Sequence, residues 1–154
     1  MGKTVERILS LGKETAAYRD QISEDSRQGI LVLGGAIYEV LQLTIRGFAA
    51  RTMSLSLSIR YYTEEIMTLG DIVKRRVMRQ IHQEGKQRSG TTLFTDICYV
   101  EEQLIDYCDM VADALIRYGK ECGDAAAEES GDDEEMRRKI HELFRDKFEM
   151  LEKE

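Results

Sequence analysis

The feature that most limits the fold of this sequence is a repeat of apolar residues at spacings of three and four, which no proline interrupts in 154 residues. Such spacing places the apolar side chains on one face of an α-helix. Proline is the residue that would end or kink such a helix. We therefore predict an all-α fold, an antiparallel helical bundle of amphipathic helices without β-strands.

The repeat divides into five predicted helices, which span 4–21, 30–51, 53–84, 91–118 and 133–154, with a loop over 85–90. We expect four parts: an N-terminal helix and linker over 1–29, a helical bundle over 30–118, an acidic linker over 119–132 and a C-terminal helix over 133–154. The predicted core stripe of the fourth helix is Leu93, Ile97, Val100, Leu104, Cys108, Val111, Leu115 and Tyr118. The predicted buried residues of the last helix are Met136, Ile140, Leu143, Phe148 and Leu151.

Composition excludes several classes of protein. The net charge is −7, which disfavours nucleic acid as a partner because phosphate binding needs a basic surface. The longest apolar run, 30–37, is too short to span a bilayer, and 1–20 lacks the apolar segment of a signal peptide. The three cysteines are an odd number without metal-ligand spacing. We therefore expect reduced thiols in a reducing compartment.

Residues that could support catalysis are scarce. The two histidines, His82 and His141, lie near no convincing serine or cysteine nucleophile motif. A di-iron oxidase of the helical-bundle type needs Glu-x-x-His, but the residues three positions before the histidines are Arg79 and Arg138. The phosphate-binding loop G-x-x-x-x-G-K-[ST] is absent. We predict no catalytic residues and no enzymatic activity.

The stretch 89–116 contains six acidic residues and no lysine or arginine. Four of these acids share one helix face, at spacings of four, three and four: Glu102, Asp106, Asp109 and Asp113. Most such faces are solvated polar surfaces. Like charges one turn apart repel each other, however. The face is therefore also a candidate for a divalent or iron-type metal ion or for a basic partner, and the residues leave both interpretations open.

The same helix carries a longer pattern, since residues 96–112 read DICYVEEQLIDYCDMVA. Asp96, the E-x-x-x-D pair of Glu102 and Asp106, Cys108 and Ala112 match the signature helix D-x-L-x-N-L-E-R-x-x-D-H-C-x-N-I-A. This stretch resembles the PhoU family, in the form found at the C-terminal end of bacterial sodium/phosphate cotransporters. The preceding segment, 53–77, follows the family pattern in apolar register, with Ile59, Tyr62, Glu64, Ile66, Leu69, Val73 and Arg76 at matching places.

The resemblance implies a three-helix PhoU-like repeat with extra helices at both ends. Members of the family act on phosphate uptake and its signalling and are not enzymes, and some bind metal clusters on acidic helix faces. It therefore implies a cytosolic regulatory domain tied to sodium-dependent phosphate transport, as a fragment of a longer membrane transporter. The implied partners are the transporter portion of the same chain or another phosphate-transport component, with homo-oligomers as a further expectation.

The candidate metal ligands are Glu102, Asp106, Asp109, Asp113, Glu64 and Asp96. Among the departures of this sequence from the family pattern, Met67 replaces an acid, Gln103 an arginine and Tyr107 a histidine. A metal cluster fed by several helices would therefore lose ligands here. The alternative function, from a different class, is a freestanding adaptor or structural bundle with no metal or phosphate role.

Overall fold

The computed structural model describes residues 24–84, 88–121 and 132–152. Within these ranges the chain forms four helices and no strand: α2 (Glu24–Ala50), α3 (Met53–Glu84), α4 (Arg88–Glu121) and α5 (Asp132–Glu152). The predicted all-α helical bundle is confirmed. The predicted helix over 4–21 and most of the predicted acidic linker lie outside the described residues.

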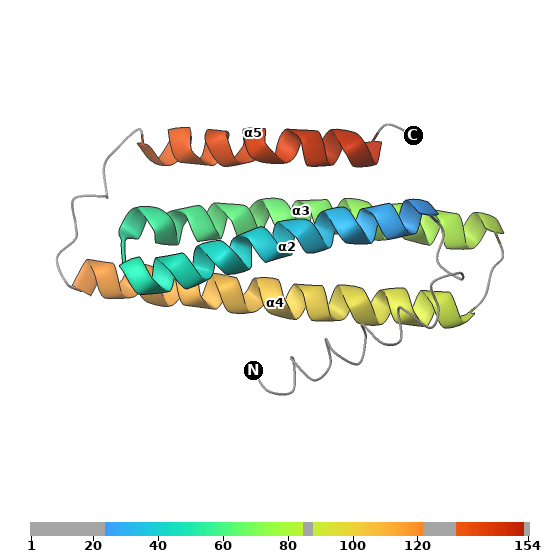
Figure 1. Ribbon diagram of the computed structural model, residues 1–154, viewed down its shortest axis with the longest axis horizontal. Coiled ribbons are helices and arrows are strands. Elements are labelled where there is room, and N and C mark those ends of the chain that lie inside the picture. The colour runs from blue at the N-terminus through green and yellow to red at the C-terminus, as the bar shows by residue number, and fades with distance from the viewer. Residues whose placement is uncertain (1–23, 85–87, 122–131, 153–154) are drawn as a thin grey trace.

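α3 is the central helix, because it packs against each of the other three. α2, α3 and α4 run side by side as an antiparallel bundle, and α5 lies along α3 on the side away from α4 (Figure 1). An ion pair between Lys147 Nζ and Glu39 Oε2, at 3.1 Å, also links α5 to α2. α5 therefore covers the side of the bundle between α2 and α3.

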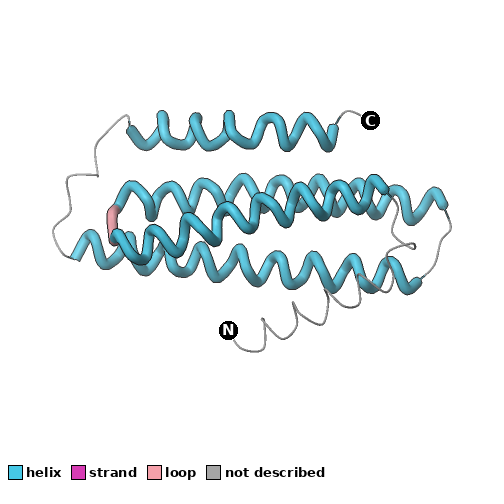
Figure 2. Tube along the Cα trace, viewed as in Figure 1, coloured by secondary structure: helices cyan, strands magenta, loops and turns pink. Residues whose placement is uncertain are grey.

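A two-residue turn, Arg51–Thr52, joins α2 to α3 and reverses the chain (Figure 2). Arg51 has a φ angle of 54°, and its N–H donates to the Gly47 carbonyl at 2.8 Å. A residue in this left-handed conformation commonly ends a helix. Next to the turn, a Cβ at Gly47 would stand only 2.8 Å from Cδ1 of Ile59. The missing side chain at position 47 thus lets α2 approach α3 closely.

Replacing Gly47 by alanine should destabilise the protein, although alanine is the better helix former, because the added methyl group overlaps the fully buried Ile59. We expect the free energy of unfolding to fall by about 1–3 kcal/mol, the usual range for overpacking a core. The control is Gly35→Ala in the same helix, where a Cβ meets nothing within 4 Å. That change should stabilise by about 0.5–1 kcal/mol. Urea unfolding measures both, and equal effects would contradict the close approach.

Most buried residues of α4 lie one position further along the sequence than the predicted core stripe. Its buried residues are Phe94, Cys98, Val100, Ile105, Cys108, Ala112 and Ile116. In the predicted stripe, by contrast, Leu104, Val111 and Leu115 are half-buried and Tyr118 is exposed. α4 carries two adjacent apolar stripes, and only one of them can face α2 and α3. Val100 and Cys108 are buried as predicted, but most of the buried face lies about 100°, the rotation of one residue, further round the helix than the predicted stripe.

α5 is held to the bundle by Phe144, which is fully buried and meets the Tyr62 ring edge-on at a centroid distance of 5.3 Å. Ile140 and Leu151 are also buried, as predicted. The prediction that Leu143 is buried is wrong, since its side chain is 58% exposed. Adjacent residues of a helix point about 100° apart, so the choice of Phe144 places Leu143 outside the interface.

Replacing Phe144 by alanine should cost about 3–5 kcal/mol, because it removes a large ring from a filled site and leaves a cavity. Leu143→Ala is the matched control one residue away, and its exposed side chain predicts a change within about 0.5 kcal/mol. Urea denaturation followed by circular dichroism compares the two. A small loss for Phe144→Ala would mean that α5 does not pack as described.

Three predicted boundaries also shift. α2 begins at Glu24, inside the predicted linker over 1–29, and α4 begins at Arg88, inside the predicted loop over 85–90. At the start of α2, Ser26 is buried and a Cβ at Gly29 would lie 3.1 Å from Val73. The stretch is therefore helical and packs against α3, although its polar composition predicts a linker. α4 also continues to Glu121, into the predicted acidic linker.

Among the described residues, one stretch is long and apolar enough to cross a membrane by length and composition: Ser26–Ala50, with a hydropathy of 1.4. The core helix of a bundle passes the same test. In α2 the apolar residues form two stripes. One stripe, with Leu33, Ile37 and Val40, is buried. The other, with Leu31, Tyr38 and Ile45, is exposed.

Candidate functional site

Two of the four acids on the predicted α4 face have counter-ions on α3. Glu102 forms an ion pair with Lys74, and Asp113 forms one with Arg60. Asp109 lies next to them and accepts a hydrogen bond from the Thr63 hydroxyl at 3.4 Å. The absence of lysine and arginine from 89–116 therefore does not leave this face without counter-ions. The cations come from the neighbouring helix rather than from α4 itself.

Of the other three candidates, Asp106 lies one turn from Glu102 beside the same cavity, whereas Glu64 and Asp96 lie elsewhere. Asp106 is exposed and forms no ion pair with a described residue. Glu64 is directed to α5, where Arg137 Nη2 reaches its Oε2 at 2.9 Å. Asp96 is half-buried near the start of α4. The structure thus joins Glu102, Asp109 and Asp113 to α3 but does not bring Glu64 to the same face.

The geometry does not support the predicted metal site. In the described ranges, no three histidine, cysteine, aspartate or glutamate side chains lie together in a way that could hold a metal ion. The ion pairs with Lys74 and Arg60 already reduce the repulsion that would favour a cation. We do not propose a metal ion at these residues.

A cavity of about 300 Å³ opens beside the Lys74–Glu102 pair. Its polar lining includes the carboxylates of Asp71, Glu101, Glu102 and Asp106 together with Lys74. Its apolar lining includes Leu33, Ile66, Met67 and Ile105. The cavity therefore combines an apolar floor from all three bundle helices with an acidic rim.

Glu101 is the unusual residue of this cavity. Its Oε2 atom is buried and has no hydrogen-bond partner among the described residues. Burial raises the pKa of the Glu101 carboxyl to about 8, an effect that nearby Lys74 opposes and Glu102 reinforces. Burial likewise raises the pKa of the Cys98 thiol to about 12, so this cysteine stays protonated and is a poor nucleophile.

Glu101 is not among the candidates that the sequence pattern predicts, because the predicted core positions on this part of the helix are 97, 100 and 104. The sequence pattern that reveals Glu101 is the neighbouring stripe, in which positions 98, 101, 105 and 108 follow one another at spacings of three, four and three. The other residues of this stripe are Cys98, Ile105 and Cys108. All three of these residues are buried. An acid on a core-facing stripe is the pattern of a buried titratable group.

The raised pKa of Glu101 predicts that the protein loses stability as the pH rises. The folded state favours the neutral carboxyl, so this contribution is fully present below the ordinary value of 4.5 and is lost as the pH rises through about 8. One pKa unit corresponds to about 1.4 kcal/mol. We expect the free energy of unfolding of the parent protein to fall by about 2–5 kcal/mol over this range because of Glu101. Glu101→Gln should not show this fall, because glutamine does not ionise.

Urea unfolding at a series of pH values measures this difference between the parent and Glu101→Gln. The control is Glu134→Gln, which changes an exposed acid of α5 and should keep the parent's pH dependence. Parallel pH profiles for the parent and Glu101→Gln would contradict the buried neutral carboxyl.

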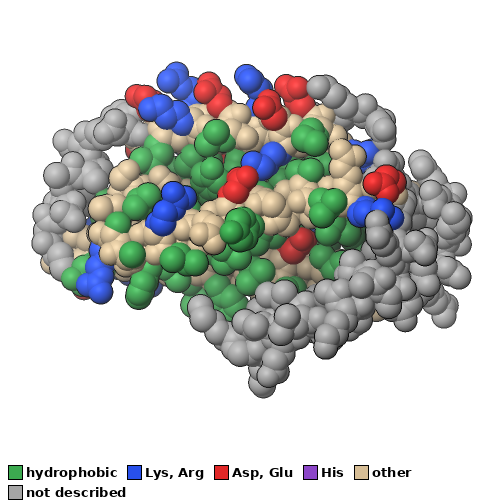
Figure 3. Space-filling model, in the orientation of Figure 1, with side chains coloured by type: hydrophobic (Ala, Val, Ile, Leu, Met, Phe, Trp, Pro, Cys, Tyr) green, Lys and Arg blue, Asp and Glu red, His purple; other side chains and the backbone are tan. Residues whose placement is uncertain are grey.

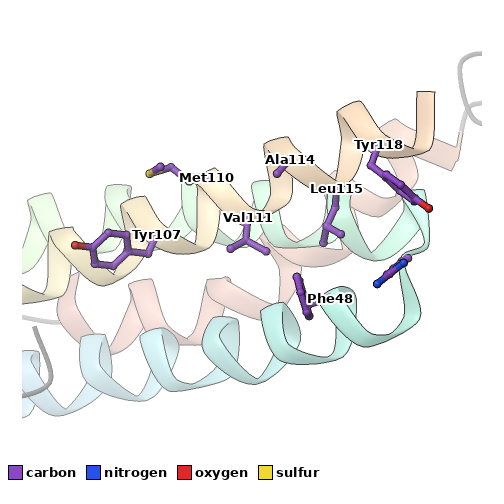
Figure 4. Close-up of a pocket in the computed structure, with 8 residues that line it drawn as sticks. Phe48, Tyr107, Met110, Val111, Ala114, Leu115 and Tyr118 are labelled. Atoms are coloured by element: carbon purple, nitrogen blue, oxygen red, sulfur yellow. The ribbon is translucent and has the colours of Figure 1, made fainter. Parts of the chain in front are cut away.

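A second pocket, of about 480 Å³, lies between the ends of α2 and α4. It is almost entirely apolar and is lined by Phe48, Arg51, Tyr107, Met110, Val111, Ala114, Leu115 and Tyr118. In Figure 4, Phe48 of α2 points toward Val111 and Leu115 of α4, with Tyr107 and Tyr118 toward the two ends. The guanidinium of Arg51 stands over the Tyr118 ring at 5.8 Å.

This pocket belongs to the one apolar side of the bundle that no described helix covers. The α2/α3 side carries α5, and the α3/α4 side carries the ion pairs of Lys74 and Arg60. The α2/α4 side instead presents large apolar residues, among them Tyr38 and Ile45, which are 64% and 63% exposed. Figure 3 shows hydrophobic side chains along the outward face of α2.

The comparisons with known proteins found no match: no family model, no curated protein and no solved structure is similar to this chain.

Proposed function

We propose that the chain is a cytosolic PhoU-like regulatory domain tied to sodium-dependent phosphate transport, which acts through contact with another protein and without catalysis. The observation that carries the proposal is the E-x-x-x-D pair of Glu102 and Asp106. These two acids lie one turn apart on α4 and are both exposed at the rim of the acidic cavity. The resemblance of 96–112 to the PhoU signature helix supports the link to phosphate.

The proposed partner is the membrane portion of the same transporter or another component of phosphate transport. Charge favours a basic contact surface on that partner. Asp71, Glu102 and Asp106 lie at the rim of the cavity, and Lys74 is the one cation among the described residues that line it. The proposal needs no metal ion. The acids serve as a recognition surface, and the apolar core of the bundle holds that surface in place.

The test replaces the natural gene by one that encodes Glu102→Gln/Asp106→Asn and measures uptake of radiolabelled phosphate at low and high phosphate supply. We expect uptake to respond more weakly to supply, because the altered rim keeps its shape but loses its charge. The control is Glu134→Gln/Glu142→Gln, which removes two exposed acids of α5 and should leave the response intact. An unchanged response after deletion of the whole segment that encodes this chain would refute the proposal.

The second candidate is a freestanding adaptor bundle with no role in phosphate transport, and the uncovered apolar pocket between α2 and α4 favours it. An adaptor needs such a pocket, because buried apolar side chains supply most of the energy at protein interfaces. The two candidates differ in the uptake experiment. An adaptor predicts normal phosphate uptake in Glu102→Gln/Asp106→Asn and a loss of partner binding in Phe48→Asp.

A further inference from the structure

The apolar pocket between the ends of α2 and α4 contains a single charged side chain. Among the described residues that line the pocket, Arg51 is the only one with a charge, and the others are aromatic or aliphatic. Arg51 forms no ion pair with a described residue, whereas Arg60 and Lys74 of α3 each pair with an acid of α4. Its contact with the face of the Tyr118 ring does not neutralise the charge. The pocket therefore combines an apolar surface with a cation that no described acid neutralises.

The pocket is long and narrow. On α4 its lining extends from Tyr107 to Tyr118, a distance of about 16 Å along the helix axis. Phe48 of α2 points toward Val111 and Leu115 between these two ends (Figure 4). A volume of about 480 Å³ over that length gives a mean cross-section of about 30 Å², which is less than half that of an α-helix with its side chains. Such a hollow suits a single extended chain better than another helix.

The cation stands at one end of this length. Arg51 lies in the turn that follows α2, and its guanidinium is 5.8 Å from the centre of the ring of Tyr118, the last pocket residue of α4. The rest of the described lining, toward Tyr107, is uncharged. A guanidinium presents its N–H donors in a planar fork that matches a carboxylate. The pocket therefore offers an anion site at one end and an apolar surface along the rest of its length.

We propose that this pocket binds a free linear carboxylate of the fatty-acid class, with its chain along α4 and its head group at Arg51. Phe48 and Met110 are 63% and 65% exposed, so both have apolar surface that the chain would remove from water. That burial supplies the affinity, and the guanidinium selects the head group. The proposal rests on the pocket alone, and it holds whether or not the chain acts in phosphate transport.

Charge directs such a ligand to this pocket rather than to the acidic cavity. Asp71, Glu102 and Asp106 line that cavity and would repel a carboxylate. The net charge of the whole chain is −7, so the overall field of the protein does not attract an anion either. Binding of a carboxylate in this pocket should therefore depend on Arg51.

The experiment titrates the full chain, labelled at the methionine methyl groups, with dodecanoate below its micelle concentration. The methyl signal of Met110 is followed by NMR, because Met110 lines the pocket, and its absence from the spectrum of Met110→Leu identifies it. Dodecyltrimethylammonium is the matched probe, since it has the same chain with a cationic head group. We expect a saturable shift of the Met110 signal, with an affinity for dodecanoate about tenfold higher than that for dodecyltrimethylammonium.

Arg51→Gln tests the anion site, because it removes the charge and keeps a polar side chain at an exposed position. We expect it to weaken the affinity for dodecanoate about fivefold, the effect of one exposed charge pair, and not to weaken that for dodecyltrimethylammonium. The control is Arg46→Gln, which removes an exposed cation of α2 that does not line the pocket and should retain the affinity of the parent.

A second pair of variants tests the apolar part of the pocket. Ala114→Phe adds a ring among the lining residues and should abolish the saturable shift with dodecanoate. Ala49→Phe makes the same change at an exposed alanine of α2 outside the lining and should retain the shift. Circular dichroism confirms that the variants stay helical. Should Ala114→Phe lose helicity, the comparison of Arg51→Gln with Arg46→Gln decides.

Two results would overturn the proposal. Equal affinities for the two probes, unchanged in Arg51→Gln, would mean that Arg51 selects no head group. The absence of a saturable shift with dodecanoate would mean that the pocket does not hold such a ligand. In that case, binding of the chain to phosphatidylglycerol vesicles would assign the pocket to a membrane surface, and no binding to them would leave it to a protein partner.

Discussion

The central position of α3 is the constraint on which the rest of the structure depends. Ile59, Ile66, Leu69 and Val73 are almost completely buried, because α3 meets a helix on each side. Its charged residues of opposite sign point to different neighbouring helices. Arg60 and Lys74 pair with acids of α4, whereas Glu64 and Glu65 pair with Arg137 and His141 of α5. Exposed pairs of this kind add little stability, but opposite signs on the two sides distinguish the two neighbours of α3.

Helices α2 and α4 carry more apolar surface than the described bundle buries. Each has one stripe that faces α3 and a second stripe about 100° away. A three-helix bundle can bury only the stripes that point to its centre. The second stripes meet on the α2/α4 side, where Leu31, Tyr38 and Ile45 remain exposed. The same excess explains why α2 is apolar enough to resemble a membrane span.

The sequence predicts the helical fold because a period of 3.6 residues is a local property. The bounds predicted for the third helix, 53–84, match α3. Local periodicity does not decide between two adjacent apolar stripes, however. It predicts Leu104 and Leu143 as core residues, whereas the structure buries their neighbours Ile105 and Phe144. The candidate site was harder still. Lys74 is 28 residues from its partner Glu102, and Arg60 is 53 from Asp113, so nothing near these acids in the sequence reveals their counter-ions.

α4 contributes to both of the hollows on the described bundle. Glu101 lies on its inner stripe, beside the acidic cavity, and Tyr107, Val111 and Tyr118 on its second stripe line the apolar pocket with Phe48 of α2. Because the two stripes lie about 100° apart on one helix, the cavity and the pocket share α4 as a wall. The Oε2 atom of Glu101 is buried on the cavity side without a hydrogen-bond partner among the described residues, which is a cost that access to water would relieve. The inner face of α4 therefore carries the unpaired polar atom of this helix, and its second face carries apolar side chains that remain open to solvent.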